Sequence, residues 1–139
     1  MASIAVEKDY EASAETVWKQ LRDFGGVASW MPGVSACDVK GDGVGAVRSI
    51  RMGTMTIVEK LESFDDGARS FAYSIIEGPM PVQNYLATVT VSARDSGCHV
   101  DWTARFDLPE GVPADAICKG LEGAYGGALA ALKKQLDPA

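Results

Sequence analysis

The stretch that decides the fold is residues 114–136, with the sequence ADAICKGLEGAYGGALAALKKQL. Pro113 precedes it at a position that a helix start tolerates, and Pro138 follows its last periodic residue. Apolar residues recur at steps of three and four, which places them on one helical face: Ile117, Leu121, Ala124, Ala128 and Leu132. We therefore predict a long amphipathic C-terminal helix over Ala114–Leu136 that packs its apolar face against the rest of the chain.

Four glycines lie inside this predicted helix: Gly120, Gly123, Gly126 and Gly127. Each interior glycine costs about 0.8–1 kcal/mol relative to alanine, so the four together weaken the helix by roughly 3–4 kcal/mol. Gly120, Gly123 and Gly127 also share one flank of the apolar face. Two explanations are open: either a sheet packs too close for side chains, or the missing side chains leave space for a ligand.

Length and composition indicate one globular domain over residues 1–139. The chain is 47% hydrophobic and 23% charged, which is ordinary for a soluble protein. The net charge of −6 argues against nucleic acid as a partner. No apolar run approaches the ~20 residues of a membrane span, so stable membrane insertion is not expected. The start of the chain lacks the basic and then apolar pattern of a secretion signal. For the oligomeric state, we expect a monomer or a homodimer.

Cysteine and histidine usage limits the chemistry available to the chain. Cys37, Cys98 and Cys118 are an odd number at wide spacings, which suits a reducing cytoplasm and includes no paired-cysteine metal motif. His99 is the single histidine, and the pattern places it at an exposed strand position. A Ser–His–Asp triad is therefore not expected. We predict no metal and no cofactor.

The pattern along the chain changes twice before the C-terminal helix. After a first strand, Ser13 caps a short predicted helix that ends near Phe24, and a second helical piece over residues 27–31 is stopped by Pro32. From Val34 onward, apolar and polar residues alternate in segments separated by glycine-containing turns. The predicted strands are residues 3–10, 34–40, 46–52, 54–64, 70–77, 83–94 and 99–108.

This order of elements predicts the α+β class. Six consecutive hairpin-linked strands form an antiparallel sheet, because neighbouring strands joined by tight turns run in opposite directions. The apolar face of the helix is then expected to cover the concave side of that sheet.

Alternation also divides each strand into an inner and an outer face. Two charged residues, Arg48 and Glu59, fall among the inward-facing positions, where an unpaired charge costs several kcal/mol. We expect them to meet each other or ordered water. They are either a structural pair near the end of the sheet or the polar end of a cavity that orients an apolar ligand. The other inward candidates on the strands include Ile50, Met52, Tyr73, Tyr85, Trp102 and Phe106.

The ordered set of elements and short motifs resembles the SRPBCC or START-like superfamily, in its polyketide cyclase/dehydrase and lipid-transport group. The motifs are residues 13–18 (SAETVW), Phe24 followed by residues 30–32 (WMP), residues 43–48 (GVGAVR) and residues 59–61 (EKL). The resemblance covers Val6–Leu136 and implies the helix-grip fold of the birch-pollen allergen. In that fold a curved seven-stranded antiparallel sheet wraps around a long C-terminal helix, two short helices join strands one and two, and a cavity lies between sheet and helix.

Within that superfamily, the middle of the chain is similar to the plant abscisic acid receptors. The closest stretch is residues 73–78 (YSIIEG), running on to Asn84 and Tyr85. The similarity implies that Tyr85 is a cavity residue. It also implies that a loop with Pro79, Met80 and Pro81 lies at the cavity mouth.

The chain departs from those receptors at three places. Their gate loop after the third strand shrinks here to the corner at Gly53. Their hormone-pairing lysine is matched by Ser35, and another cavity acid is matched by Trp102. Hormone sensing is therefore not expected, whereas the cavity and the Arg48–Glu59 pair survive the comparison.

Taken together, these patterns predict a single START-like domain that binds or carries a small hydrophobic molecule, such as a lipid, polyketide, isoprenoid or aromatic compound. One alternative is a cyclase/aromatase- or isomerase-like enzyme in which Glu59 is the best candidate for proton transfer. Another is a co-chaperone-like interaction module, which would carry a large exposed apolar patch. The predicted ligand-binding residues are Arg48, Ile50, Met52, Glu59, Tyr73, Tyr85, Trp102, Phe106, Leu121, Ala124 and Ala128.

Overall fold

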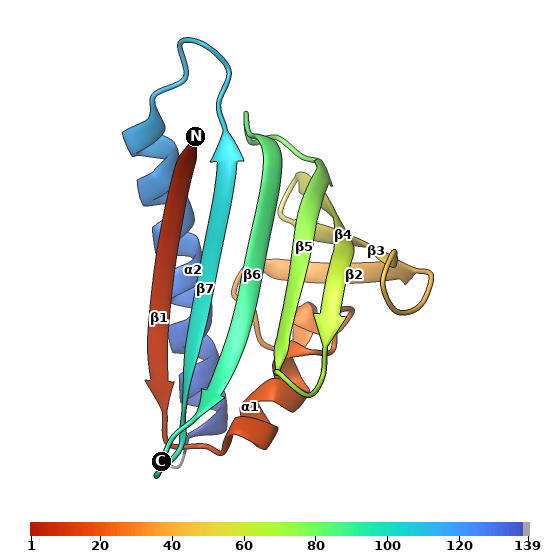
Figure 1. The fold of residues 1–139 in the computed structure, drawn as a ribbon. Coiled ribbons are helices and arrows are strands. Elements are labelled where there is room, and N and C mark those ends of the chain that lie inside the picture. Colours follow the sequence, from red (N-terminus) through yellow and green to blue (C-terminus); the bar gives the residue numbers. More distant parts are fainter. Residues whose placement is uncertain (138–139) are drawn as a thin grey trace.

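One antiparallel sheet and one long helix hold most of the chain in the computed structural model, which describes residues 1–137 (Figure 1). The predicted second short helix is only a three-residue 3-10 turn, η1. The elements are β1 (Ala2–Tyr10), α1 (Ala14–Leu21), η1 (Val27–Ser29), β2 (Val34–Lys40), β3 (Val47–Met52), β4 (Met55–Asp65), β5 (Ser70–Glu77), β6 (Gln83–Ala93), β7 (Cys98–Asp107) and α2 (Ala114–Leu136).

The seven strands are ordered β1-β7-β6-β5-β4-β3-β2, and every neighbouring pair is antiparallel. Strands β2 to β7 therefore form a meander, and β1 is added at the β7 edge. The α+β helix-grip architecture expected from the sequence is confirmed.

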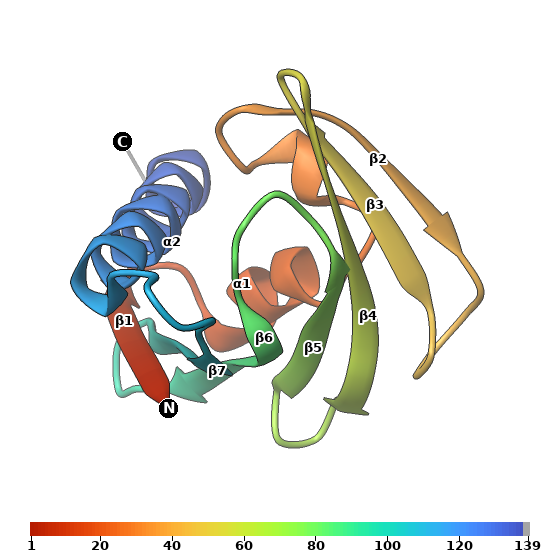
Figure 2. The same cartoon turned by 90° about the horizontal axis from the view of Figure 1, so that it is seen from above.

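The sheet is strongly curved, and register shifts show where it bends. Shifts occur between Leu61 and Ser63 in the β4–β5 pair, and between Gln83 and Leu86 in the β6–β7 pair. Asn84, inside the second of these, has a positive φ of 53°. Such irregularities bend a strand and increase its twist. Figure 2 shows the result: the sheet curves from β1 through β5 to β2, and α2 lies on its concave side.

The C-terminal half of α2 is tied to β1 and to the connection that follows it. The Tyr10 hydroxyl donates to the carbonyl oxygen of Leu129 at 2.7 Å. The carboxylate of Asp137 accepts hydrogen bonds from the backbone N–H groups of Glu11 and Ala12, each at 3.0 Å. Lys133 Nζ donates to the Asp9 carbonyl at 2.9 Å. The expected role of Pro138 in ending the helix lies outside the described residues.

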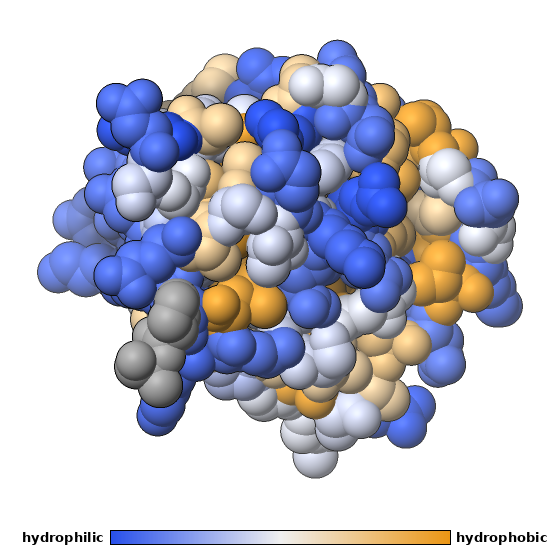
Figure 3. All heavy atoms as spheres, turned by 90° about the horizontal axis from the view of Figure 1, so that it is seen from below, coloured by the Kyte–Doolittle hydropathy of each residue, from blue (hydrophilic) through white to orange (hydrophobic). Residues whose placement is uncertain are grey.

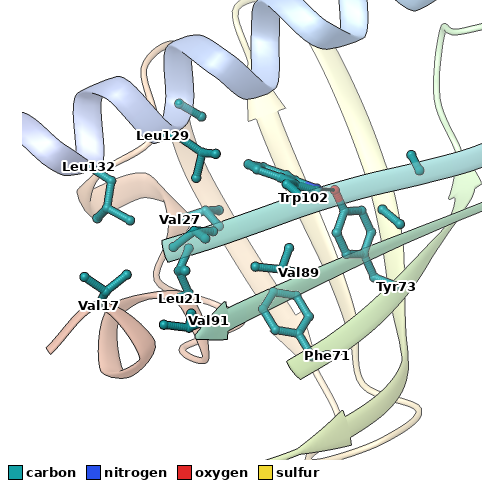
Figure 4. Packing of buried hydrophobic residues seen from close by; sticks show 14 of the residues in the cluster. Val17, Leu21, Val27, Phe71, Tyr73, Val89, Val91, Trp102, Leu129 and Leu132 are labelled. Carbon is teal, nitrogen blue, oxygen red and sulfur yellow. Dashed lines mark hydrogen bonds between the residues drawn. The ribbon is translucent and has the colours of Figure 1, made fainter. Parts of the chain in front are cut away.

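The buried face of α2 differs from the predicted one at two positions. Leu121, Ala128 and Leu132 are buried as predicted. Ala124 is exposed, whereas Leu129, which was not assigned to the face, is completely buried. In Figure 4, Leu129 and Leu132 point from α2 into the core formed with α1 and the sheet. The reason is that Ala124 lines a hollow between α2 and the sheet and does not pack against the sheet itself.

Candidate functional site

A cavity of about 400 Å³ lies between the concave face of the sheet and the middle of α2. Most of the sequence-predicted site residues meet in its wall. Those are Arg48, Ile50, Met52, Glu59, Tyr73, Trp102, Leu121, Ala124 and Ala128, together with Pro79 and Met80 of the β5–β6 connection.

Three of the predicted residues do not line this cavity: Tyr85, Phe106 and Pro81. Tyr85 and Phe106 are buried and stack on each other, with ring centroids 5.8 Å apart. Alternation placed both correctly on the inner face of the sheet. That face is covered near them by Tyr125 of α2, whose hydroxyl contacts the Tyr85 hydroxyl. Alternation alone does not reveal such a cover.

The cavity wall also holds residues that the predicted set lacks: Met31, Pro32, Met55, Ile57, Gly123, Tyr125 and Gly127. Because Met52 and Met80 also line the cavity, its wall contains all four methionines that follow Met1 in the sequence. Methionine is flexible and polarisable, and it is common at surfaces that adapt to varied ligands. Its concentration between residues 31 and 80 is a signal that could have directed attention to these positions.

The helical wall of the cavity explains the glycines of α2. A Cβ atom built at Gly120, Gly123, Gly126 or Gly127 meets no atom within 4 Å among the residues that the structure describes. The explanation by close packing against a sheet is therefore wrong, and the glycines border open space. Gly123 and Gly127 lie directly in the cavity wall, next to the exposed Ala124.

Arg48 and Glu59 form a buried ion pair at the sheet side of the cavity. They lie directly opposite each other in the β3–β4 register. Arg48 Nε donates a hydrogen bond to Glu59 Oε1 at 2.8 Å. Arg48 Nη2 forms a salt bridge with the same oxygen at 2.7 Å. A third nitrogen, Nη1, donates to the carbonyl oxygen of Phe24 at 2.9 Å. The guanidinium also lies 4.0 Å from the centre of the Phe24 ring and 5.1 Å from that of Tyr73.

The electrostatics of the pair follow from its burial. Only 3% of Arg48 and 6% of Glu59 is exposed, so both charges have left water. Burial raises the pKa of Glu59, and the neighbouring Arg48 opposes that rise. The pair is neutral overall, which makes this end of the cavity polar without a net charge.

A cluster of aromatic polar groups lies on the other side of Tyr73. Trp102 Nε1 donates to the Tyr73 hydroxyl at 3.2 Å, and that hydroxyl donates to the Tyr125 hydroxyl at 3.2 Å. The Tyr85 and Tyr125 hydroxyls are also hydrogen-bonded. The Tyr125 ring stacks on Trp102 with centroids 4.0 Å apart. Burial raises the pKa of Tyr73 and of Tyr125, so both hydroxyls keep their protons at neutral pH.

His99 lies on the outer face of the sheet, away from the cavity, and its predicted exposure is wrong. Its side chain is only 13% exposed, because acidic residues of β1 and β7 surround it. Nδ1 lies 2.5 Å from Asp9 Oδ1, while Nε2 lies 3.3 Å from Asp101 Oδ1 and 3.8 Å from Glu7 Oε2. The hydrogen bond with Asp9 is the largest cause that raises the pKa of His99. Glu7, His99 and Asp101 have the donor types of a metal site, but charge pairing accounts for their arrangement.

The structure has further hollows that are more open than the cavity. One of about 520 Å³ includes Phe24, Val39, Leu61 and Phe64 in its lining, together with the charged Arg22, Asp23 and Asp42. An open depression of about 540 Å³ on the outer face of β1, β7 and β6 includes Ser3, Thr88, Thr103 and Arg105 in its lining. Figure 3 shows one face of the molecule, on which hydrophobic residues form separate groups among hydrophilic ones. That face gives no support to the hypothesis of an interaction module with one large apolar patch. Neither α1 nor α2 has the apolar run that crossing a bilayer requires.

Comparison with known proteins identifies relatives of the whole chain. The family model described as "Polyketide cyclase / dehydrase and lipid transport" matches residues 1–137. Abscisic acid receptor PYL7 of Arabidopsis thaliana is 29% identical over 124 residues, which are 83% of this chain and 59% of the receptor. The chain thus spans about three fifths of the length of that curated relative. The resemblance inferred from the sequence is confirmed.

Solved structures share the architecture over almost the full length. The protein XoxI from Bacillus cereus superposes with a TM-score of 0.90 at 29% identity, covering 98% of this chain and 96% of XoxI. The crystal structure of Ara h 8.0201 superposes with a TM-score of 0.81, covering 97% of each chain. Its identity of 14% shows a common fold and nothing more.

Proposed function

Because the chain belongs to the polyketide cyclase / dehydrase and lipid transport family, we propose that it binds or carries a small hydrophobic molecule in the cavity between the sheet and α2. The ligand classes that suit such a cavity are lipids, polyketides, isoprenoids and aromatic compounds. The relative from Arabidopsis, by its name an abscisic acid receptor, supports a small-molecule ligand in this fold.

The observation that carries the proposal is the chemistry of the cavity wall. Its volume of about 400 Å³ is within the range of small-molecule sites. Its lining is mostly apolar, with methionines and two isoleucines facing small helix residues across the space. The few polar groups are led by Arg48 and Glu59 on the sheet side, with Tyr125 on α2. An apolar site with a few convergent polar groups is the usual form of a binding pocket.

A neutral fluorescent probe tests this proposal directly. We expect N-phenyl-1-naphthylamine to gain fluorescence on binding and to raise the melting temperature through simple linkage. Ala124→Phe places a ring in the cavity from α2 and should weaken the binding of this probe at least about tenfold. Ala124 is exposed in the structure, so the variant should keep its stability to within about 0.5 kcal/mol.

Ala130→Phe is the matched control, because Ala130 is an exposed residue of α2 that does not line the cavity. It should bind the probe like the unmodified protein. If neither probe fluorescence nor thermal stability responds to N-phenyl-1-naphthylamine, or if both variants bind it equally well, the cavity is not the binding site.

A second function for the same cavity is cyclase/aromatase- or isomerase-like catalysis. The observation in its favour is Glu59, a carboxylate in the cavity wall whose pKa is raised by burial, as proton transfer at neutral pH requires. With a linear polyketide as substrate, Glu59→Gln should abolish turnover even at a temperature where circular dichroism shows that the destabilised variant is still folded. Unchanged turnover would show that Glu59 does not transfer a proton in the reaction.

A further inference from the structure

The hydrogen bonds of the aromatic cluster leave one hydroxyl proton without a protein acceptor. The cluster has four donors, on Trp102, Tyr73, Tyr85 and Tyr125, but only three hydrogen bonds join them. The spare proton belongs to Tyr85 or to Tyr125, depending on which of the two donates. Tyr85 is 3% exposed and does not line the cavity, so a spare proton there would be buried and unpaired.

Such an unpaired buried donor costs about 1–3 kcal/mol, which favours the arrangement in which Tyr85 donates to Tyr125. The hydroxyl of Tyr125 then accepts from both Tyr73 and Tyr85, and its own proton is available. Tyr125 lines the cavity, so this proton is a donor for whatever the cavity holds.

The ion pair supplies a matching acceptor. The hydrogen bond from Arg48 Nε and the 2.7 Å salt-bridge contact of Nη2 both end on Glu59 Oε1, and among residues 1–137 no side-chain hydrogen bond ends on Oε2. Among the described residues, Trp30 Nε1 is the one side-chain polar atom that is fully buried and has no hydrogen-bond partner. Glu59 Oε2 also has no partner but is not fully buried, so part of its surface is accessible. Glu59 lines the cavity, and we infer that this surface of Oε2 faces it. Arg48 is already committed to Glu59 and to the Phe24 carbonyl.

We propose that the ligand is an uncharged molecule whose hydroxyl group accepts a hydrogen bond from Tyr125 and donates one to Glu59 Oε2. This inference rests on the proposed binding function and specifies its ligand class: alcohols, phenols or enols with an apolar body. A hydroxyl both accepts and donates, so a ligand hydroxyl placed between these two wall groups would pair with both. Tyr73 lies between them, with its ring over Arg48 and its hydroxyl on Tyr125.

The same arrangement selects against carboxylates. A ligand carboxylate would place a second negative charge beside Glu59, while Arg48 is already neutralised. Two like charges in a buried site repel strongly, and neither finds water to offset its desolvation. Ligands that carry a carboxylate at this end should therefore bind more weakly than the corresponding alcohols.

A matched panel of naphthalene derivatives tests the proposal by displacement of N-phenyl-1-naphthylamine at about pH 7.5, where naphthols are neutral and exposed carboxylates are ionised. The panel is 2-naphthol, 2-methoxynaphthalene, 2-naphthoate and naphthalene. We expect 2-naphthol to bind at least about fivefold more tightly than its methyl ether, which cannot donate to Glu59. The binding of 2-naphthoate should be the weakest.

Glu59→Gln should weaken the preference for 2-naphthol and improve the binding of 2-naphthoate, a combination that loss of folding cannot mimic. The amide replaces the free acceptor by a donor, so the preference for 2-naphthol over the ether should fall to about twofold or less. The variant also leaves Arg48 without a counter-charge, so 2-naphthoate should bind more tightly than to the unmodified protein. Glu62→Gln is the matched control on the same strand, because Glu62 is exposed and bonded to Ser74 outside the cavity. It should keep the original order.

Tyr125→Phe tests the other hydrogen bond. The naphthol and the ether both accept from Tyr125, so both should lose affinity relative to naphthalene while the ratio between them stays unchanged. The outcomes separate the two levels of the proposal. If N-phenyl-1-naphthylamine does not bind, the binding function itself fails. If it binds but 2-naphthol, its ether and 2-naphthoate compete equally, or Glu59→Gln leaves their order unchanged, the hydroxyl preference is wrong.

Discussion

At the residue scale, the tightest steric constraint lies at Gly97, in the turn between β6 and β7. Its φ is +81°, and a Cβ atom there would lie 1.9 Å from the carbonyl oxygen of Tyr10. The turn thus packs directly on the end of β1, where the chain leaves the sheet for α1. Both the backbone conformation and the contact require glycine.

Gly97→Ala should therefore lower the free energy of unfolding by at least about 2 kcal/mol, from positive-φ strain and overpacking combined. Urea titration monitored by circular dichroism measures the loss. Gly45→Ala is the control: Gly45 has a φ of +97° but no neighbour within 4 Å, so only the strain applies, at about 1 kcal/mol. Equal losses at the two sites would mean that the β6–β7 turn moves away without cost.

The contacts of His99 predict a pH dependence of stability. Because its pKa is raised in the folded state, the stabilisation is fully present below the ordinary value of about 6.5 and is lost as pH rises through the raised pKa. At the acid end it persists until Asp9 is protonated, and the pKa of Asp9 is itself lowered by His99. The melting temperature should thus exceed that of His99→Gln by more at about pH 5.5 than at about pH 8.5. Parallel pH profiles of the two proteins would contradict this interpretation.

At the element scale, α2 is divided into two functional halves. Tyr10, Lys133 and Asp137 anchor its C-terminal half to β1 and the following connection. Small residues in its middle, Gly123 and Gly127 among them, line the cavity. The helix can therefore hold its position and still leave space beside it.

Alanine at the glycines of α2 that do not line the cavity should stabilise the protein. Gly120 and Gly126 have room for a methyl group, and alanine is the better helix former. Gly120→Ala and Gly126→Ala should each raise the free energy of unfolding by about 0.5–1 kcal/mol without changing the affinity for N-phenyl-1-naphthylamine. Thermal and urea unfolding check the first part, and probe titration checks the second. A loss of stability would show that the methyl groups meet an obstacle.

At the scale of the whole molecule, Arg48 joins parts that are distant in sequence. It connects β3 to Glu59 of β4 and to the chain that follows α1, through the Phe24 carbonyl. The pair therefore holds the curved arm of the sheet against the short helical segment. It is structural and is at the same time part of the cavity wall.

Breaking this pair on one side should cost more than replacing both partners. Arg48→Met and Glu59→Leu each leave a buried charge uncompensated, so each should lower the free energy of unfolding by about 3–5 kcal/mol. The double variant should lose clearly less than the sum of the two, because no buried charge remains. Urea unfolding of the three variants measures the coupling, and additive losses would contradict it.

Local patterns were sufficient for the secondary structure and for the inner face of the sheet. Alternation placed Arg48, Glu59, Tyr73 and Trp102 inward, and all four line the cavity. Alternation also placed Tyr85 inward, but it could not show that a side chain from α2 covers it. The exposure of His99 was misjudged for a similar reason, since its burial comes from carboxylates on β1 and on its own strand β7.

The sequence by itself determined the order of the elements, the antiparallel meander and the amphipathic C-terminal helix, because periodicity and turn residues act over a few neighbouring positions. Only the tertiary structure decided that Gly123 and Gly127 of α2 border a cavity and that Tyr125 closes one side of it. It also decided that Arg48 is occupied while one oxygen of Glu59 remains available. These features depend on where α2 lies across the sheet and on which hydrogen bonds remain after packing. Both are set by contacts between residues far apart in the chain.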